Sequence, residues 1–432
     1  MRIAIIGSGI SGLYAAWRLG RDHEVTIFEA NDYVGGHTNT RDVEWQGKHY
    51  AIDTGFIVFN DWTYPNFIAM LRELGVAWQP SDMSFSLQCE RTGLEYNGTS
   101  LNTLFAQRRN IVRPSFLRML AEILRFNREA KQFLVDADPS LSLADYLRNG
   151  RYSRAFIERY IVPMGRAIWS AEANSMLACP ASFFIGFFDR HGMLSVDARP
   201  QWQAVRGGSR EYVRAILRAI KGEVRLATPV LQVTRMPEQV IVRTSSGDAE
   251  HFDSVFFACH SDQALALLQQ PTDAEREVLS AFPYAPNEAI LHTDESLLPR
   301  APLARAAWNY HALANDQQAV ALTYDMNVLQ TIEAPVRFLV TLNNAPAIDE
   351  RKIIDRFAYD HPVYLPAGVA AQARHREING THRTYYCGAY WRYGFHEDGV
   401  VSAMRALEHF EADAHARAAP VAGSSLALVP LP

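Results

Sequence analysis

Residues 1–37 constrain the fold of this chain more than any other stretch of it. Residues 3–6 are apolar and mostly β-branched, which is typical of a buried parallel strand. The turn Gly7-Ser8-Gly9-Ile10-Ser11-Gly12 follows at once, and a helical pattern then runs to Leu19. A second apolar run covers 24–28 and ends at Glu29. The order of strand, glycine turn, helix, strand and acid predicts one βαβ unit.

Each glycine of this turn has a steric reason to be there. We expect Gly7 to make the turn, Gly9 to let the backbone approach a diphosphate, and Gly12 to let the helix pack on the strand. Backbone N–H groups at the helix start, around Ser11, would face the phosphates together with the helix dipole. Glu29 is placed to accept hydrogen bonds from a ribose and would repel a 2′-phosphate. The stretch therefore predicts a dinucleotide site rather than a chance glycine turn.

A glycine pair, Gly35 and Gly36, follows this acid and precedes His37 and Thr38. With it the sequence resembles the flavin amine oxidase superfamily, which includes monoamine and polyamine oxidases, protoporphyrinogen oxidase and the phytoene-type desaturases. Its members combine a βαβ unit with Glu-x5-Gly-Gly, as Glu29 to Gly36 does here. The resemblance implies FAD and an α/β fold, in which an α+β substrate domain is inserted into a Rossmann-like FAD-binding domain. Members usually have Arg where this chain has His37.

The resemblance implies further cofactor contacts along the chain. Asp53-Thr54-Gly55-Phe56 is similar to an Asp-x-Gly element beside the flavin ring, although a plain turn after a strand is the alternative. Val230 matches the position whose backbone meets the adenine, and the helix after Gly399 would point its N-terminus at the flavin. The predicted cofactor-contacting residues are Gly7, Gly9, Ser11, Gly12, Glu29, Gly35, Gly36, His37, Thr38, Thr54, Gly55, Phe56, Val230, Gly388, Glu397, Asp398, Gly399 and Val400.

One departure from the family pattern concerns the closing motif. Most relatives have Asp directly after the glycine equivalent to Gly388, and this chain has Ala389. Glu397 or Asp398 could replace that contact, or both could simply cap the helix predicted from Val400 to about Phe410.

A chain of 432 residues exceeds one ordinary core, so two domains are expected. We predict a discontinuous FAD-binding domain over 1–75, 200–270 and 380–420, a substrate-binding domain over 76–199 and 271–379, and a flexible tail over 421–432. Within these regions we expect a helix over 348–357 and a helix over 154–170 that is interrupted by Pro163 and Gly165.

Composition excludes several classes of protein. A net charge of −5 argues against a nucleic-acid partner, which needs a concentrated positive face. The N-terminus lacks the pattern of a signal peptide, and no apolar run approaches membrane-spanning length, so we expect a cytoplasmic protein without a transmembrane segment. The cysteines form no C-x-x-C pair, so no metal site is expected. None lies in the sequence context that tethers flavin in some relatives, which predicts non-covalent FAD.

Residues 115–133 form an amphipathic helical pattern, and Arg108, Arg109 and Arg113 precede it. These arginines could face anionic lipid as a peripheral membrane contact. Interleaved glutamates favour the alternative of a plain solvated face.

The sequence also bears on the chemistry. No second G-x-G-x-x-G is found, so a separate NAD(P)H site is not expected. Amine oxidases of the family usually hold a water near the flavin with a Lys from the substrate domain, but no Lys lies between Gly222 and Arg351. We select His396 as a base or hydrogen-bonding group, with a structural histidine as the alternative. Trp308 and Tyr310 are selected as lining of an apolar pocket, with a core role as the alternative.

These observations favour an FAD-dependent dehydrogenase or desaturase that takes hydride from an apolar small molecule. The motif from Gly394 to Gly399 also resembles a bacterial branch of FAD oxidoreductases whose genes often accompany cyclopropane-fatty-acid-synthase-like methyltransferases. That resemblance implies a fatty-acyl or other lipid substrate. A flavin amine oxidase and a non-catalytic flavin-binding partner protein are the alternatives.

Overall fold

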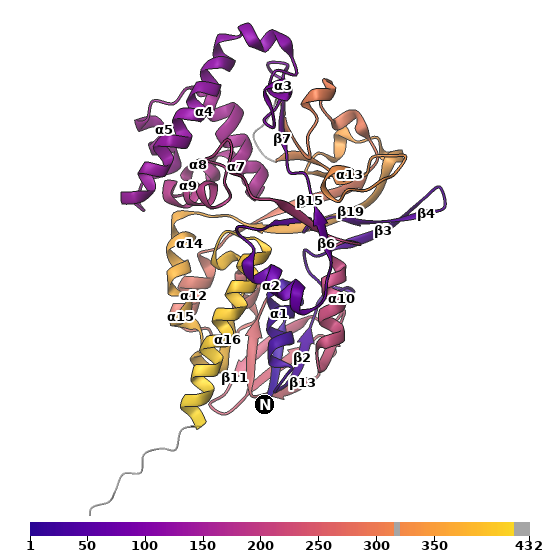
Figure 1. Ribbon diagram of the computed structural model, residues 1–432. Coiled ribbons are helices and arrows are strands. Elements are labelled where there is room, and N and C mark those ends of the chain that lie inside the picture. Colours follow the sequence, from indigo (N-terminus) through magenta and orange to yellow (C-terminus); the bar gives the residue numbers. More distant parts are fainter. Residues whose placement is uncertain (315–319, 419–432) are drawn as a thin grey trace, which may run out of the picture.

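The structure is a computed structural model that describes residues 1–314 and 320–418. Figure 1 shows two bodies of secondary structure, a lower one around the N-terminal strands and an upper one that carries the helices α4 to α9. The predicted tail over 421–432 lies outside the described residues.

The lower body is built on a five-stranded parallel sheet with the order β10-β2-β1-β14-β20. Its strands are β1 (Arg2–Ile6), β2 (Glu24–Phe28), β10 (Gly222–Arg225), β14 (Ser254–Phe257) and β20 (Thr384–Tyr386). The strands come from three separate parts of the sequence. The domain limits drawn from the sequence stay predictions.

Side chains of the central strand β1 alternate between two buried clusters. Ile3 and Ile5 pack with the helices on one face, and Ala4 and Ile6 pack toward a three-stranded antiparallel sheet on the other. The helices are α1 (Ile10–Leu19), α2 (Pro65–Glu73), α10 (Arg210–Ala219) and α16 (His396–Ala418). The second sheet consists of β11 (Val230–Arg235), β12 (Val240–Thr244) and β13 (Ala249–Phe252).

The upper body contains a mixed seven-stranded sheet with the order β19-β15-β18-β17-β16-β7-β8. Its strands are β7 (Phe85–Cys89), β8 (Leu94–Asn97), β15 (Tyr284–His292), β16 (Trp308–Ala312), β17 (Ala321–Asp325), β18 (Leu339–Leu342) and β19 (Ile353–Pro362). Helices α4 (Pro114–Phe133), α5 (Leu143–Asn149), α7 (Val162–Trp169), α8 (Ala173–Ala178) and α9 (Ala181–Arg190) stand together beside it (Figure 1). The predicted α/β fold is confirmed, and it contains a parallel sheet and a separate mixed sheet.

Short elements join the two bodies. The hairpin of β3 (Thr40–Trp45) and β4 (Lys48–Asp53) and the small sheet of β5 (Val58–Asn60), β9 (Trp202–Val205) and β6 (Trp78–Pro80) lie between them. The remaining α-helices are α3 (Leu101–Leu104), α6 (Arg154–Phe156), α11 (Ser261–Leu267), α12 (Asp273–Ser280), α13 (Met326–Leu329), α14 (Pro366–Ala371) and α15 (His375–Ile378).

Three predictions of secondary structure were wrong. The segment 348–357 is not a helix, because 353–362 pairs along the whole of β15 as the edge strand β19 and alternates in exposure. Helix α7 continues through Pro163 and Gly165, since a π-helical turn over Ile157–Ile161 widens the backbone just before the proline. Helix α16 begins at His396 rather than Val400 and ends at Ala418 rather than near Phe410.

Candidate active site

The glycine turn after β1 has the geometry that its sequence predicts. Gly7 has a φ of +102°, and a Cβ there would lie 2.8 Å from the carbonyl oxygen of Ala258. A Cβ on Gly12 would lie 2.1 Å from the carbonyl oxygen of Gly7, so the helix could not pack this closely with any other residue. A Cβ on Gly9 would meet nothing within 4 Å. The turn is closed on its strand side and open beside Gly9.

The start of α1 is suited to an anion. Among the described residues no side chain caps it, and its first turn carries no acid. Backbone N–H groups at such a helix start have no intrahelical acceptor and lie at the positive end of the dipole. The open side of the turn therefore fits the diphosphate of a dinucleotide.

A second helix start lies directly against the first. A Cβ on Gly399 would lie 2.7 Å from Ile10 Cγ2 and 2.9 Å from Ser11 Oγ, and the Ser11 hydroxyl donates a hydrogen bond of 3.0 Å to the Gly399 carbonyl. Figure 1 shows α1 and α16 side by side. Because two positive helix ends meet here, negative charge is favoured between them.

The acids in the first turn of α16 bind backbone donors. Glu397 accepts from the N–H groups of Asn66 at 3.2 Å and Phe67 at 2.9 Å, which caps α2. Asp398 accepts from the N–H groups of Tyr393 at 3.2 Å and Phe395 at 3.0 Å. Burial raises the pKa of both carboxyls, that of Asp398 to about 6. This placement favours capping over the predicted cofactor contact.

The carboxylate of Glu29 already accepts hydrogen bonds from the two loops beside it. It accepts from Ser8 N–H at 2.9 Å and Ser8 Oγ at 2.6 Å, and from Asn31 N–H at 2.9 Å and Asn31 Nδ2 at 3.1 Å. A carboxylate offers about four acceptor sites, so a ribose would have to replace some of these bonds. The segment that leads to Val230 lies alongside, because Thr228 N–H donates to the Glu29 carbonyl at 2.9 Å.

The second glycine pair and the Thr54–Phe56 segment meet near the turn. A Cβ on Gly36 would lie 3.2 Å from Gly9 Cα, and a Cβ on Gly55 would lie 2.2 Å from the His37 carbonyl oxygen. Phe56 N–H donates to that same oxygen at 2.8 Å. Segments that are far apart in the sequence thus come together as predicted, while their contact with a cofactor stays a prediction.

His396 lies at this junction as a neutral ring. It stacks on Phe56 with 3.5 Å between ring centroids, and its Nε2 hydrogen-bonds Thr38 Oγ1 at 2.9 Å and the Tyr212 hydroxyl at 3.1 Å. Burial lowers the pKa of His396 to about 3. A group with this pKa is a weak general base near neutral pH, so the geometry favours a hydrogen-bonding and positioning role. Tyr212 was missed, although it follows the Gly207-Gly208 turn that opens α10.

The other selected residues lie further along the fold. Gly388 lies just after β20, where its N–H donates to Ser402 Oγ at 3.0 Å, and Val400 is fully buried. Trp308 and Tyr310 lie on β16, where Trp308 packs edge-on to Tyr324 at 5.2 Å. They belong to the seven-stranded sheet, whereas His396 lies at the start of α16.

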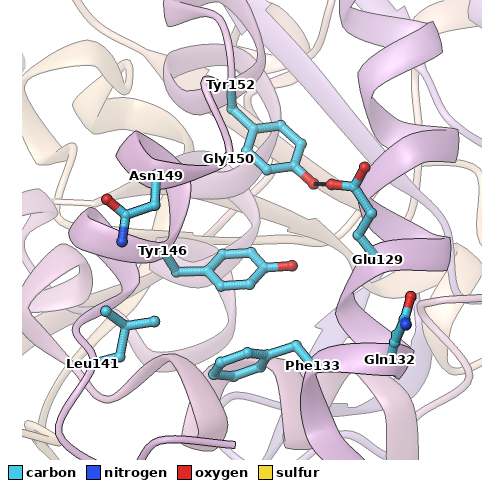
Figure 2. A pocket seen from close by; sticks show the side chains of 8 residues that line it. All are labelled: Glu129, Gln132, Phe133, Leu141, Tyr146, Asn149, Gly150 and Tyr152. Atoms are coloured by element: carbon cyan, nitrogen blue, oxygen red, sulfur yellow. Dashed lines mark hydrogen bonds between the residues drawn. The ribbon is translucent and has the colours of Figure 1, made fainter.

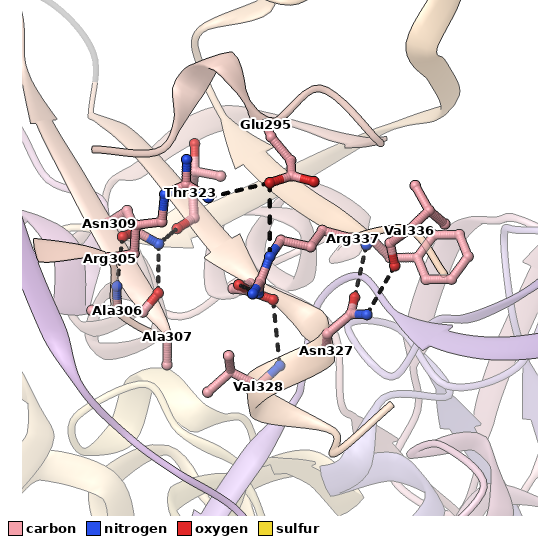
Figure 3. A network of polar contacts seen from close by, with 12 residues as sticks. Glu295, Arg305, Ala306, Ala307, Asn309, Thr323, Asn327, Val328, Val336 and Arg337 are labelled. Atoms are coloured by element: carbon pink, nitrogen blue, oxygen red, sulfur yellow. Dashed lines mark hydrogen bonds and ion pairs between the residues drawn. The ribbon is translucent and has the colours of Figure 1, made fainter. Parts of the chain in front are cut away.

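A polar network anchors β16 (Figure 3). Asn309, between Trp308 and Tyr310, accepts from Ala306 N–H at 2.9 Å and donates to the Thr323 carbonyl at 3.2 Å. Glu295 pairs with Arg305 at 3.2 Å and Arg337 at 3.8 Å in the same network. A buried, bonded asparagine fixes the register of the strand that carries the two aromatic side chains.

The loop before α16 faces the helices of the upper body through aromatic rings. Phe395 stacks on Phe187 of α9 at 5.2 Å, Tyr393 lies 4.8 Å from Phe183, and Trp169 Nε1 donates to the Tyr393 carbonyl at 3.0 Å. The surroundings on this side of the α16 start are therefore apolar.

A hollow of about 300 Å³ lies elsewhere, between α4 and α5 (Figure 2). Glu129 occupies its rim and accepts from the Tyr152 hydroxyl at 2.8 Å, above the ring of Tyr146. Its lining comes from the helical body alone, so it is separate from the glycine turn.

Asp53 is a buried acid. The sequence identifies it only within the motif Asp53-Thr54-Gly55-Phe56 and predicts no contact for its side chain. It accepts from Ser209 N–H at 2.9 Å, Thr40 Oγ1 at 2.5 Å and Gln330 Nε2 at 2.9 Å, which ties α10 to the β3–β4 hairpin and to α13. Burial raises the pKa of Asp53 to about 6. No group of three potential metal ligands occurs in the described part of the chain.

Comparisons with known proteins agree with this geometry. Residues 10–317 match the family described as flavin containing amine oxidoreductase. The chain is 27% identical over 263 residues to a Mycobacterium tuberculosis protein named "Putative flavin-containing monoamine oxidase AofH", a match that covers 57% of this chain and 54% of that one. The chain thus spans about half the length of this relative.

Solved structures share the fold along almost the whole chain. A CLA-producing fatty acid isomerase from P. acnes is similar with a TM-score of 0.69 at 16% identity, covering 95% of this chain and 98% of that one. A cyclohexylamine oxidase from Brevibacterium oxydans is similar with a TM-score of 0.68 at 16% identity, covering 95% and 99%. At this identity the likeness concerns the fold alone.

Proposed function

Because the chain belongs to the flavin-containing amine oxidoreductase family, we propose that it is an FAD-dependent oxidoreductase that removes hydride from an apolar organic substrate. The observation that carries this proposal is the meeting of the α1 and α16 starts, joined by the Ser11–Gly399 hydrogen bond of 3.0 Å. Bound FAD would supply the hydride acceptor. Two helix ends placed together favour the negative charge that a reduced flavin gains.

The residues around the turn can hold FAD without a covalent bond. The N–H groups after Gly9 would bind the diphosphate, Glu29 would take the ribose once Ser8 or Asn31 releases it, and the backbone near Val230 would border the adenine. His396 and the Thr54–Phe56 segment would border the flavin. None of the cysteines lies in a tethering sequence context, which supports non-covalent binding.

The lysines argue against ordinary amine oxidase chemistry. Lys48, Lys131, Lys221 and Lys352 are the lysines of the sequence, and each of them is exposed. Lys352 also pairs with Asp294 at 2.9 Å. No lysine is therefore positioned to hold a water inside the protein, as many relatives do.

The surroundings of the site favour an apolar substrate. The loop before α16 meets the upper body through Phe187, Tyr393 and Phe395, and the neutral ring of His396 adds no charge. A fatty-acyl or other lipid substrate would suit such apolar surroundings, because its chain gains free energy from leaving water.

An exposed apolar tip supports contact with a membrane surface. Leu101 is 76% exposed and Val112 is 80% exposed, next to Arg108, Arg109 and Arg113 at the end of the upper body near α3 (Figure 1). Apolar side chains flanked by arginines suit peripheral binding to anionic lipid. Across the described residues no helix is long and apolar enough to span a membrane. The unpaired cysteines support the proposed cytoplasmic location.

Anaerobic mixing tests the proposal. A fatty-acyl lipid should bleach the flavin absorbance of the purified protein. Bleaching by a polyamine but not by lipids, with release of hydrogen peroxide in air, would instead establish an amine oxidase, the activity after which the mycobacterial relative is named. A protein that holds FAD but that no donor reduces would be a non-catalytic flavin-binding partner.

A further inference from the structure

Three histidines from distant parts of the chain lie together beside the glycine turn. The ring of His37 lies 5.4 Å from that of His361 and 6.4 Å from that of His260, measured between ring centroids. Tyr359 stacks on His37 at 4.9 Å, and Tyr284 stacks on His260 at 4.3 Å. We call His37, His260 and His361 the histidine cluster.

The histidine cluster lies at the edge of the parallel sheet where the diphosphate is expected. His37 directly follows Gly36, which packs against Gly9. His260 follows the end of β14, where Ala258 and Cys259 pack against Gly7 at 2.8 Å and 3.1 Å from the position of a Cβ. The three histidines are half-buried, as are Gly7 and Gly9, although the strands behind them are fully buried.

The hydrogen bonding of the cluster leaves capacity for a ligand. His37 Nε2 is enclosed and has no hydrogen-bond partner within the part of the chain that the structure describes. Asn287 Nδ2 lies 3.3 Å from His361 Nδ1. Relatives usually have Arg at the position of His37, so this chain lacks a permanent positive charge there.

Burial and the repulsion between neighbouring histidines keep the cluster neutral. Burial lowers the pKa of His361 to about 4, and burial together with His361, His260 and His396 lowers the pKa of His37 well below 6.5. Asp262 and Asp360 oppose the lowering of the pKa at His260. Each histidine is therefore able to gain a proton if an anion arrives.

We propose that the histidine cluster is the counter-charge for the cofactor diphosphate, and that FAD binding is accompanied by proton uptake on these rings. The inference rests on the proposed binding of FAD, and it extends that proposal to how this site neutralises the phosphates. A dianion beside an imidazole stabilises the imidazolium form, whereas an arginine in the same place would need no proton.

The consequence is a pH-dependent affinity. A complex that takes up one proton loses up to about tenfold in affinity for each unit by which the pH rises between the free and the bound pKa. A site with a permanent arginine would lack this dependence.

Titration calorimetry of the flavin-stripped full chain with FAD, in phosphate and in Tris at pH 7, measures the protons taken up. The wild type should take up between about half and one proton per FAD. His37→Arg should bind FAD with almost no proton uptake. His361→Gln should also take up fewer protons than the wild type, and it provides the test if His37→Arg does not fold. His49→Arg, on the exposed edge of β4, is the matched control and should retain the wild-type uptake.

FAD binding without proton uptake, or wild-type uptake by both His37→Arg and His361→Gln, would overturn this inference. Neither result would touch the proposed oxidoreductase activity. That activity fails separately, if the loaded protein is not reduced by any lipid or amine.

Discussion

The contact between the two helix starts makes a sharp prediction for Gly399→Ala. In an open helix this change stabilises by up to about 1 kcal/mol, because alanine restricts the unfolded chain. Here the new Cβ would lie 2.7 Å from Ile10 Cγ2 and 2.9 Å from Ser11 Oγ. Forcing these groups apart costs about 1–3 kcal/mol, and loss of the Ser11 hydrogen bond costs about 1 kcal/mol more. The net loss of unfolding free energy should be about 1–3 kcal/mol.

The same change should weaken FAD binding, because it moves one positive helix end away from the other. A helix-end interaction contributes about 0.3–1 kcal/mol, which corresponds to a loss in affinity of about threefold. Gly186→Ala in α9 is the matched control, since its Cβ would only touch the Tyr393 hydroxyl at 3.4 Å. Urea unfolding and flavin fluorescence titration measure both quantities. A Gly399→Ala protein as stable as Gly186→Ala, with unchanged FAD affinity, would show that the close contact of the two helix starts supports neither stability nor FAD binding.

Further predictions concern buried charge and the exposed tip. The pKa of His396 in the folded protein is about 3, which is below that of an unfolded histidine. This difference should lower the unfolding free energy of the wild type by about 2 kcal/mol from pH 7.5 to pH 5. His396→Phe should remove this part of the loss, as measured by urea unfolding at both pH values. The raised pKa of Asp53 works in the opposite direction, since the folded protein gains stability as the pH falls through about 6. The unfolding free energy of the wild type should therefore rise by about 1 kcal/mol relative to that of Asp53→Asn from pH 8 to pH 5, and an unchanged difference between the two proteins would contradict this. Val112→Ser should reduce sedimentation of the protein with vesicles that contain phosphatidylglycerol. Val135, which is 77% exposed, lies beyond the other end of α4, and Val135→Ser should not reduce sedimentation. An equal loss in both variants would contradict membrane contact through the exposed apolar tip.

The parallel-sheet half of the fold was predictable because its determinants are local. The first strand, the glycine turn and α1 are contiguous in the sequence, and Gly12 packs within the unit against the Gly7 carbonyl. The segment 353–362 was misread because its structure depends on pairing with β15, a partner far away in the sequence. Such pairing overrides local propensity.

The candidate site divides in the same way. Motifs located the glycine turn, the second glycine pair and the start of α16, but not what their side chains bind. The hydrogen bonds of Glu397 to α2 depend on a helix more than three hundred residues earlier in the chain. The histidine cluster could not be assembled from the sequence, because only His37 differs visibly from a known pattern. His260 and His361 carry no local signal at all.

The proposed function requires a flavin that lies along the glycine turn and the start of α16. The absorbance and mass of the purified protein, before and after denaturation, test whether this flavin is present. We predict a yellow protein that carries one FAD per chain and releases it intact on denaturation. A colourless protein that does not bind added FAD would contradict the whole account.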